Sequence, residues 1–209
     1  MSQQFFHQKL SELTIAQNLM ETDTIFTKNQ LLNSGVSESL IKEMLQHALL
    51  EENSPNIYMK PGIHINDFLL IQLMLPKGVF AFETALYLHQ LTDRYPYEIH
   101  LSFPMGYKLP QKAAEISATI IPKTPREPFY SLEIEEQAIE GTRHCINVYS
   151  KEKTLCDIVK RKHTVEQEII NHAYKTYLAS EHKNIHRLLQ VARQMKAEKQ
   201  VNQILEVLL

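Results

Sequence analysis

Residues 25–62, IFTKNQLLNSGVSESLIKEMLQHALLEENSPNIYMKPG, predict the fold of the N-terminal part of the chain. Thr27 is placed to cap a short helix over residues 28–33, and Ser37 is placed to cap a longer helix after it. Gly35 between them predicts a tight turn, because glycine adopts a positive φ at little cost. Apolar residues recur at helical spacing after Ser37, at Leu40, Ile41, Met44, Leu45 and Ala48. This order is typical of a helix-turn-helix.

The flanking segments extend this pattern to a winged helix-turn-helix. Upstream, Phe6, Leu10, Leu13 and Ala16 lie at helical spacing and predict a first helix over residues 5–20. Downstream, residues 49–52 and 57–60 predict two short strands around a turn at residues 53–56. We therefore expect a winged helix-turn-helix domain over residues 1–60.

The pattern changes after Pro61-Gly62 and predicts a second domain over residues 61–209. A helix is expected over residues 82–91, and strands are expected over residues 97–103, 116–121, 129–135 and 144–149. From Ser150 onward the pattern is helical, with a capping-box spacing between Thr164 and Gln167. The expected fold class is α+β: a winged helix-turn-helix, then a mixed α/β domain with a small sheet and a helical C-terminal third.

Composition and charge narrow the class of protein. The chain has 209 residues, 44% of them hydrophobic and 22% charged, which excludes disordered and collagen-like sequences. Two cysteines cannot build a disulfide framework, and no signal peptide or membrane-spanning run is evident, so we expect a cytoplasmic protein. The net charge of −2 is unevenly distributed. Residues 1–60 hold four basic and seven acidic residues, a net charge of −3. Residues 142–209 hold twelve basic and seven acidic residues, a net charge of +5.

Enzyme motifs are absent from the sequence. It contains no nucleophile elbow, P-loop or dinucleotide fingerprint, and its five glycines provide no phosphate-binding loop of that kind. His182 and His186 share the spacing of a helical zinc pair, but no HExxH pattern occurs, and Glu181 and His172 are candidate third ligands only by proximity in sequence. Cys156 has apolar neighbours and is predicted to be a buried thiol. We therefore expect no catalytic residue, no metal and no cofactor.

A basic segment surrounds Asp157 and allows more than one interpretation. Its basic residues are Arg143, Lys151, Lys153, Lys160, Arg161 and Lys162. Asp157 and Lys153 are four residues apart, which predicts an ordinary helical ion pair. The alternatives are a basic face that meets phosphate, supplying contacts that the acidic N-terminal domain lacks, and a nuclease-like site using Asp157 with Glu152.

The helix after Ser37 presents the candidate DNA-reading side chains. Ser39, Lys42 and Gln46 fall on its outward face, where they could bond base edges or phosphates in a major groove. Glu38 and Glu43 fall on the same face and would repel phosphate. An acidic winged helix that binds a partner protein is therefore the alternative to DNA binding.

The sequence resembles a known family in three places. Residues 25–62 resemble the winged helix of AbiEi-type antitoxins, the transcriptional regulators of abortive-infection (type IV) toxin–antitoxin systems. Residues 75–108, LPKGVFAFETALYLHQLTDRYPYEIHLSFPMGYK, resemble the start of the family's second domain. Residues 146–163, INVYSKEKTLCDIVKRKH, resemble its Thr-Leu-Cys-Asp signature, the most specific of the three.

This resemblance implies a non-enzymatic antitoxin that represses its own phage-defence operon by binding inverted repeats in promoter DNA, as a possible homodimer. It implies a nucleotidyltransferase-like toxin as the functional partner, counteracted without a stable complex, and no membrane association. Glu152, Thr154 and Asp157 would belong to the antitoxin role. The DNA contacts would fall on Lys28, Ser37, Ser39, Lys42, Gln46, Asn53, Asn56 and Tyr58. Unlike the family, the chain has no Gly before the wing Tyr and no Arg in the reading helix.

Overall fold

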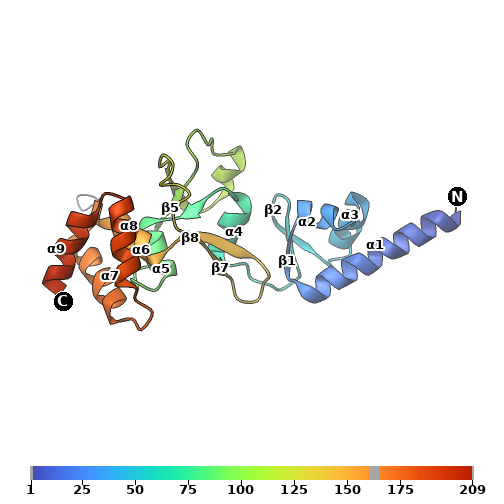
Figure 1. Ribbon diagram of the computed structural model, residues 1–209. Coiled ribbons are helices and arrows are strands. Elements are labelled where there is room, and N and C mark those ends of the chain that lie inside the picture. Colours follow the sequence, from blue (N-terminus) through green and yellow to red (C-terminus); the bar gives the residue numbers. More distant parts are fainter. Residues whose placement is uncertain (1, 161–164, 209) are drawn as a thin grey trace. The chain divides into compact units, whose positions relative to one another are not determined.

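The computed structural model describes residues 2–160 and 165–208, and its chain divides by contacts into two compact units (Figure 1). The first unit is Met1–Met74 together with Ala138–Cys145, and the second is Leu75–Gln137 together with Ile146–Leu209. Each contains helices and a small sheet, so the fold is mixed α+β as expected. No helix in the described ranges is both long and apolar enough to cross a membrane.

The first unit combines four helices with a three-stranded antiparallel sheet. Its elements are α1 (Ser2–Thr22), β1 (Ile25–Thr27), α2 (Lys28–Asn33), α3 (Glu38–Gln46), β2 (Glu51–Ser54), β3 (Ile57–Met59) and α4 (Asp67–Met74). The sheet order is β1-β3-β2. The caps are those that the sequence predicts: Thr27 forms a capping box with Gln30, and the Ser37 hydroxyl accepts a hydrogen bond from the Leu40 amide.

The core of the first unit explains why these short elements hold together. Phe26, Leu31, Leu40, Ile41 and Met44 are each at most 4% exposed and pack into one cluster. The turn between α2 and α3 holds Gly35 at a φ of 99°, a conformation that favours glycine. The segment Ala138–Cys145 belongs to this unit because His144 Nε2 lies 2.9 Å from the Ile25 carbonyl oxygen and Thr24 bonds the Gly141 carbonyl.

The second unit is built on a five-stranded mixed sheet in the order β6-β5-β4-β8-β7. The strands are β4 (Val79–Phe80), β5 (Glu98–Ser102), β6 (Thr119–Lys123), β7 (Ile134–Ala138) and β8 (Cys145–Tyr149). β4 pairs antiparallel with β5 and parallel with β8, and β5 pairs parallel with β6. Helix α5 (Phe82–Leu88) follows β4, and a 3-10 turn (Gln111–Glu115) precedes β6.

Four helices after Ser150 supply most of one apolar cluster of the second unit, which also contains Leu86 and Leu91 (Figure 1). They are α6 (Lys151–Lys160), α7 (Gln167–Ala179), α8 (Ile185–Gln194) and α9 (Glu198–Leu208). Leu155, Cys156, Tyr174, Leu188 and Val201 are all fully buried in this cluster. Ser150 caps α6 as predicted, its hydroxyl accepting from the Lys153 amide.

Several elements differ from the sequence expectation. The strand expected over residues 129–135 begins only at Ile134, because the preceding residues turn and Glu133 has a φ of 57°. The capping box expected at Thr164 involves a residue outside the described ranges, and α7 has Glu166 at its N-cap without a side-chain cap bond. By contacts α4 groups with the first unit, so that unit extends beyond residue 60 to Met74.

Candidate functional site

Helix α3 presents the residues that the sequence assigns to DNA reading. Ser39, Lys42 and Gln46 are exposed. Ser37 has a structural role instead: its hydroxyl donates to a Glu12 carboxylate oxygen at 2.7 Å and caps α3. The three exposed side chains are therefore those that could reach a nucleic acid.

Each of the two acidic residues on α3 forms an ion pair with a lysine from another helix. Lys28 Nζ lies 2.8 Å from a Glu38 carboxylate oxygen, and Lys9 Nζ lies 3.0 Å from Glu43. The hydrogen bond from Lys28 lowers the pKa of Glu38 below its ordinary value. These exposed pairs add little stability, but they offset the two acids that would repel phosphate. With Lys42, the five charged groups sum to +1: three lysines less two glutamates.

The hairpin after α3 carries three of the side chains that the sequence assigns to DNA contact. Asn53 and Asn56 are exposed, and Asn56 occupies the turn with a φ of 66°. Tyr58 is only 6% exposed and packs in the core of the first unit. Strand β3 directs the Tyr58 ring inward, unlike the two asparagines, and its expected DNA contact stays a prediction.

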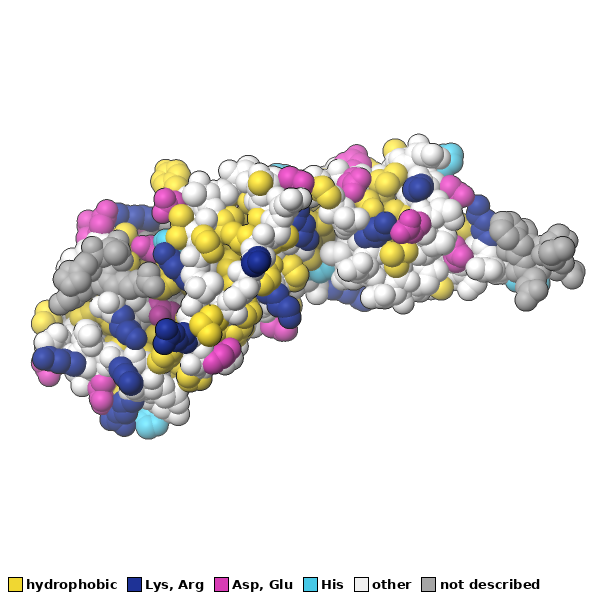
Figure 2. Space-filling model, turned by 90° about the horizontal axis from the view of Figure 1, so that it is seen from above, with side chains coloured by type: hydrophobic (Ala, Val, Ile, Leu, Met, Phe, Trp, Pro, Cys, Tyr) yellow, Lys and Arg dark blue, Asp and Glu magenta, His cyan; other side chains and the backbone are white. Residues whose placement is uncertain are grey.

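The basic segment around Asp157 does not form the single solvated face that we considered. Lys153 is 2% exposed, whereas Lys151 is half-buried and Lys160 is exposed. Arg143 is exposed but belongs to the first unit, and Arg161 and Lys162 lie outside the described residues. On the face drawn in Figure 2, Lys and Arg side chains are interspersed with acidic ones rather than gathered into one patch.

Lys153 and Asp157 make the predicted ion pair, but in a buried setting. Lys153 Nζ lies 2.9 Å from Asp157 Oδ2 and 3.3 Å from the centroid of the Tyr149 ring. Burial lowers the pKa of Lys153, and the neighbouring Asp157 carboxylate opposes that shift. The ammonium group is thus held between a carboxylate and an aromatic face.

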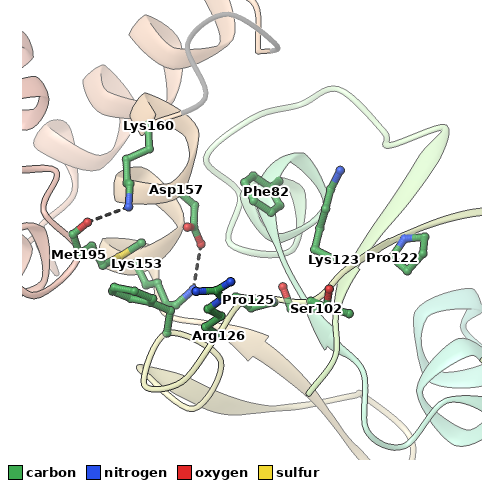
Figure 3. Close-up of a pocket in the computed structure, with 12 residues that line it drawn as sticks. Phe82, Ser102, Pro122, Lys123, Pro125, Arg126, Lys153, Asp157, Lys160 and Met195 are labelled. Atoms are coloured by element: carbon green, nitrogen blue, oxygen red, sulfur yellow. Dashed lines mark hydrogen bonds and ion pairs between the residues drawn. The ribbon is translucent and has the colours of Figure 1, made fainter. Parts of the chain in front are cut away.

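A cavity of about 630 Å³ opens beside this pair within the second unit (Figure 3). Its lining side chains come from the start of α5, the ends of β5 and β6, the segment that follows β6, helix α6 and the residue after α8. They are Phe82, Ser102, Pro122, Lys123, Thr124, Pro125, Arg126, Phe129, Lys153, Asp157, Lys160 and Met195. Phe82 has a φ of 50°, a left-handed backbone conformation that is strained for an aromatic residue.

The nuclease-like interpretation requires a second acid beside Asp157. Of the described residues that line the cavity, Asp157 is the single acidic one. Glu152 is 6% exposed and accepts a 2.7 Å hydrogen bond from the Tyr177 hydroxyl, away from the cavity lining. Within the described ranges, no three His, Cys, Asp or Glu residues lie close enough together to hold a metal ion.

An acidic and aromatic cluster around Arg187 was not predicted from the sequence. Arg187 donates to Glu133 and Glu135, and its Nε lies 4.0 Å from a Glu152 carboxylate oxygen. The Tyr177 hydroxyl donates a hydrogen bond to Glu152 and accepts one from the Asn184 amide. No local spacing signals this cluster. Its members come from β7, α6, α7 and α8, and from the residues just before β7 and α8.

Two further candidates from the sequence are the zinc pair of His182 with His186 and the signature residue Thr154. His182 lies in the turn before α8 and His186 in its first turn, so the two do not share a helix face as their spacing predicted. Thr154 is fully buried and its hydroxyl donates to the Tyr149 carbonyl. Of Glu152, Thr154 and Asp157, therefore, only Asp157 lines the cavity.

The thiols are expected to differ sharply in reactivity. Cys156 is buried as predicted, and burial raises its pKa to about 12, whereas Cys145 is exposed. Because the thiolate is the reactive form, Ellman's reagent should modify one thiol per native chain and both after denaturation. A Cys145→Ser variant should lose the fast reaction entirely. Rapid modification of both thiols in the native protein would contradict this assignment.

Comparisons with known proteins bear on the fold. No protein-family model matches the chain, and no curated protein matches it. Among solved structures, the crystal structure of the RV2827C protein from Mycobacterium tuberculosis is similar, with a TM-score of 0.53 and 12% sequence identity. The match covers 92% of this chain and 79% of that one. At this identity the likeness shows a shared fold that extends over most of both chains.

Proposed function

We propose that the first unit is a winged helix-turn-helix and that the chain is a non-enzymatic, DNA-binding transcriptional regulator. The observation that carries the proposal is the order α1, β1, α2, α3, β2, β3 around one antiparallel sheet. In this arrangement the helix after the tight turn is the one that enters the major groove, and the hairpin is the wing. Here that helix is α3, which exposes Ser39, Lys42 and Gln46.

The chemistry of these side chains suits a duplex. Lys42 would contact phosphate or a guanine edge, and Gln46 could pair with adenine through two hydrogen bonds. The ion pairs of Glu38 with Lys28 and of Glu43 with Lys9 support the proposal, since they reduce repulsion at this face. Asn53 and Asn56 on the wing would add neutral contacts to the backbone.

We further propose, from the resemblance to AbiEi-type antitoxins, that the regulator represses its own operon and serves as its antitoxin. Promoter DNA with inverted repeats, bound by a pair of copies, would be the target. A nucleotidyltransferase-like toxin would be counteracted without a stable complex. Asp157 is the signature residue best placed for an antitoxin role, because it lines a cavity whereas Glu152 and Thr154 are buried.

A protein-binding winged helix is the second candidate, and one observation favours it. A largely apolar groove of about 580 Å³ runs between α1 and α3, and two leucines in its lining, Leu13 and Leu49, are 45% and 50% exposed. Exposed apolar groups of this kind often mark protein contacts. Failure of the DNA titration below would leave this candidate as the better one.

The DNA titration uses fluorescence anisotropy on the chain's own upstream sequence, with an unrelated duplex beside it and several salt concentrations. Lys42→Ala should reduce the slope of the logarithm of the binding constant against the logarithm of the salt concentration by about one, whichever duplex is used. Gln46→Ala should weaken operator binding by roughly 5- to 100-fold and leave the unrelated duplex almost unchanged. Lys175→Ala, an exposed lysine on α7 of the second unit, serves as the matched control. Equal weak binding to both duplexes at low salt would contradict sequence-specific recognition.

A further inference from the structure

We propose that the cavity of the second unit is a binding site for a small organic phosphate, carrying a phosphomonoester or diphosphate group. Among the residues that the structure describes, four cationic side chains line it, Lys123, Arg126, Lys153 and Lys160, against the single carboxylate of Asp157. Four positive charges less one negative charge leave an excess of three (Figure 3). An anion with more than one charge is the ligand that balances such an excess.

The three cations other than Lys153 keep their charge available. Asp157 and the Tyr149 ring already compensate Lys153. Lys160 Nζ donates to the Met195 carbonyl at 2.8 Å and lies 5.5 Å from the Phe129 ring centroid. A carbonyl oxygen and a ring face are neutral groups, so they fix the position of the ammonium without cancelling its charge.

Lys123 is held in a similar way on the opposite side of the cavity. Its Nζ lies 6.0 Å from the Phe82 ring centroid, and the two side chains lie side by side in Figure 3. Glu83, half-buried and bonded to His100, is an acid outside the lining that feels the charge of Lys123. Arg126 is exposed at the rim, and its planar guanidinium can bond two oxygens of one phosphate at once.

The depth of the cavity favours a small molecule over the backbone of a duplex. Phe82, Ser102, Lys153 and Met195 contribute to the lining although each is at most 7% exposed, so part of the wall lies below the surface. A volume of about 630 Å³ falls in the range of small-molecule sites. The Thr124 hydroxyl, from an exposed residue, is a further donor in the lining.

The test is a calorimetric titration of the full chain with pyrophosphate at constant ionic strength. Saturable binding is expected with a Kd below about 1 mM, and sodium chloride added to the same ionic strength should give none. Arg126→Gln and Lys123→Gln should each weaken binding by about tenfold or more, the effect of losing one charge-assisted hydrogen bond. Lys175→Gln, a charge loss of equal size outside this cavity in the same unit, should bind as the parent does. Thermal unfolding of each variant checks that the fold is retained.

Three results would overturn the site. Absence of saturable binding is the first, and equal weakening by Lys175→Gln is the second, since it would indicate general charge attraction. The third is competition by DNA: if a duplex displaces pyrophosphate to the same extent as the duplex itself binds, the cavity would be assigned to nucleic acid. The proposal does not depend on DNA recognition by the first unit. Lys42→Ala should alter DNA binding and leave the pyrophosphate Kd unchanged, so the two proposals can fail separately.

Discussion

Replacing Asp157 with alanine is expected to lower the free energy of unfolding of the second unit by roughly 3 kcal/mol. The reason is the asymmetry of the ion pair: the Lys153 side chain is 2% exposed, whereas that of Asp157 is 16% exposed. Without the carboxylate, a buried ammonium would keep only the face of Tyr149 as its partner. Denaturant unfolding followed by far-UV circular dichroism measures the loss.

The pH dependence of that loss distinguishes a buried charge from a packing defect. Burial already lowers the pKa of Lys153 from its ordinary value, and removing Asp157 would lower it further. The unfolded chain then binds more protons than the folded one, so stability rises with pH until the unfolded lysine titrates near 10.5. Part of the loss in Asp157→Ala should therefore be recovered as the pH is raised toward that value.

Two companion variants complete the comparison. Lys153→Met removes the buried charge and leaves a carboxylate that water can reach, so its loss should be about 1 kcal/mol or less. The double variant Lys153→Met with Asp157→Leu replaces the pair by apolar groups and should recover most of the stability. Losses of equal size in both single variants, independent of pH, would contradict the buried-charge explanation.

Local signals account for most of what could be predicted in the first unit. The caps at Thr27 and Ser37 and the positive φ of Gly35 depend on residues within a few positions, so the helices were predicted closely. Strand β1, only three residues long, was missed because it exists through pairing with β3, more than thirty residues away. The inward direction of Tyr58 follows from that same sheet.

The second unit depends more on distant pairing, and its prediction was poorer. β5 pairs parallel with β6 and β4 pairs parallel with β8, arrangements that leave no short-range spacing in the sequence. The contact of Lys153 with Asp157 was predictable from its helical spacing. Lys123 and Arg126 reach the same cavity only because of where β6 ends, so no motif could associate them with α6.

The second large effect is expected at Tyr177, whose hydroxyl is bonded on both sides. It donates to Glu152 Oε1 at 2.7 Å and accepts from the Asn184 amide at 2.8 Å. Tyr177 is fully buried, and burial raises the pKa of its hydroxyl, which stays protonated as a donor. Tyr177→Phe would leave a buried carboxylate oxygen and an amide without this partner, at a cost of about 2–3 kcal/mol.

Tyr174 on the same helix provides the matched control for Tyr177. It is equally buried, but its hydroxyl donates only to the neutral Leu155 carbonyl at 3.2 Å. Tyr174→Phe should therefore cost about 1 kcal/mol, the ordinary value for one neutral hydrogen bond. Chemical denaturation of the two variants beside the parent measures the difference. A loss at Tyr174 equal to that at Tyr177 would mean that the charge of Glu152 adds nothing, and that Arg187, 4.0 Å from its carboxylate, already satisfies it.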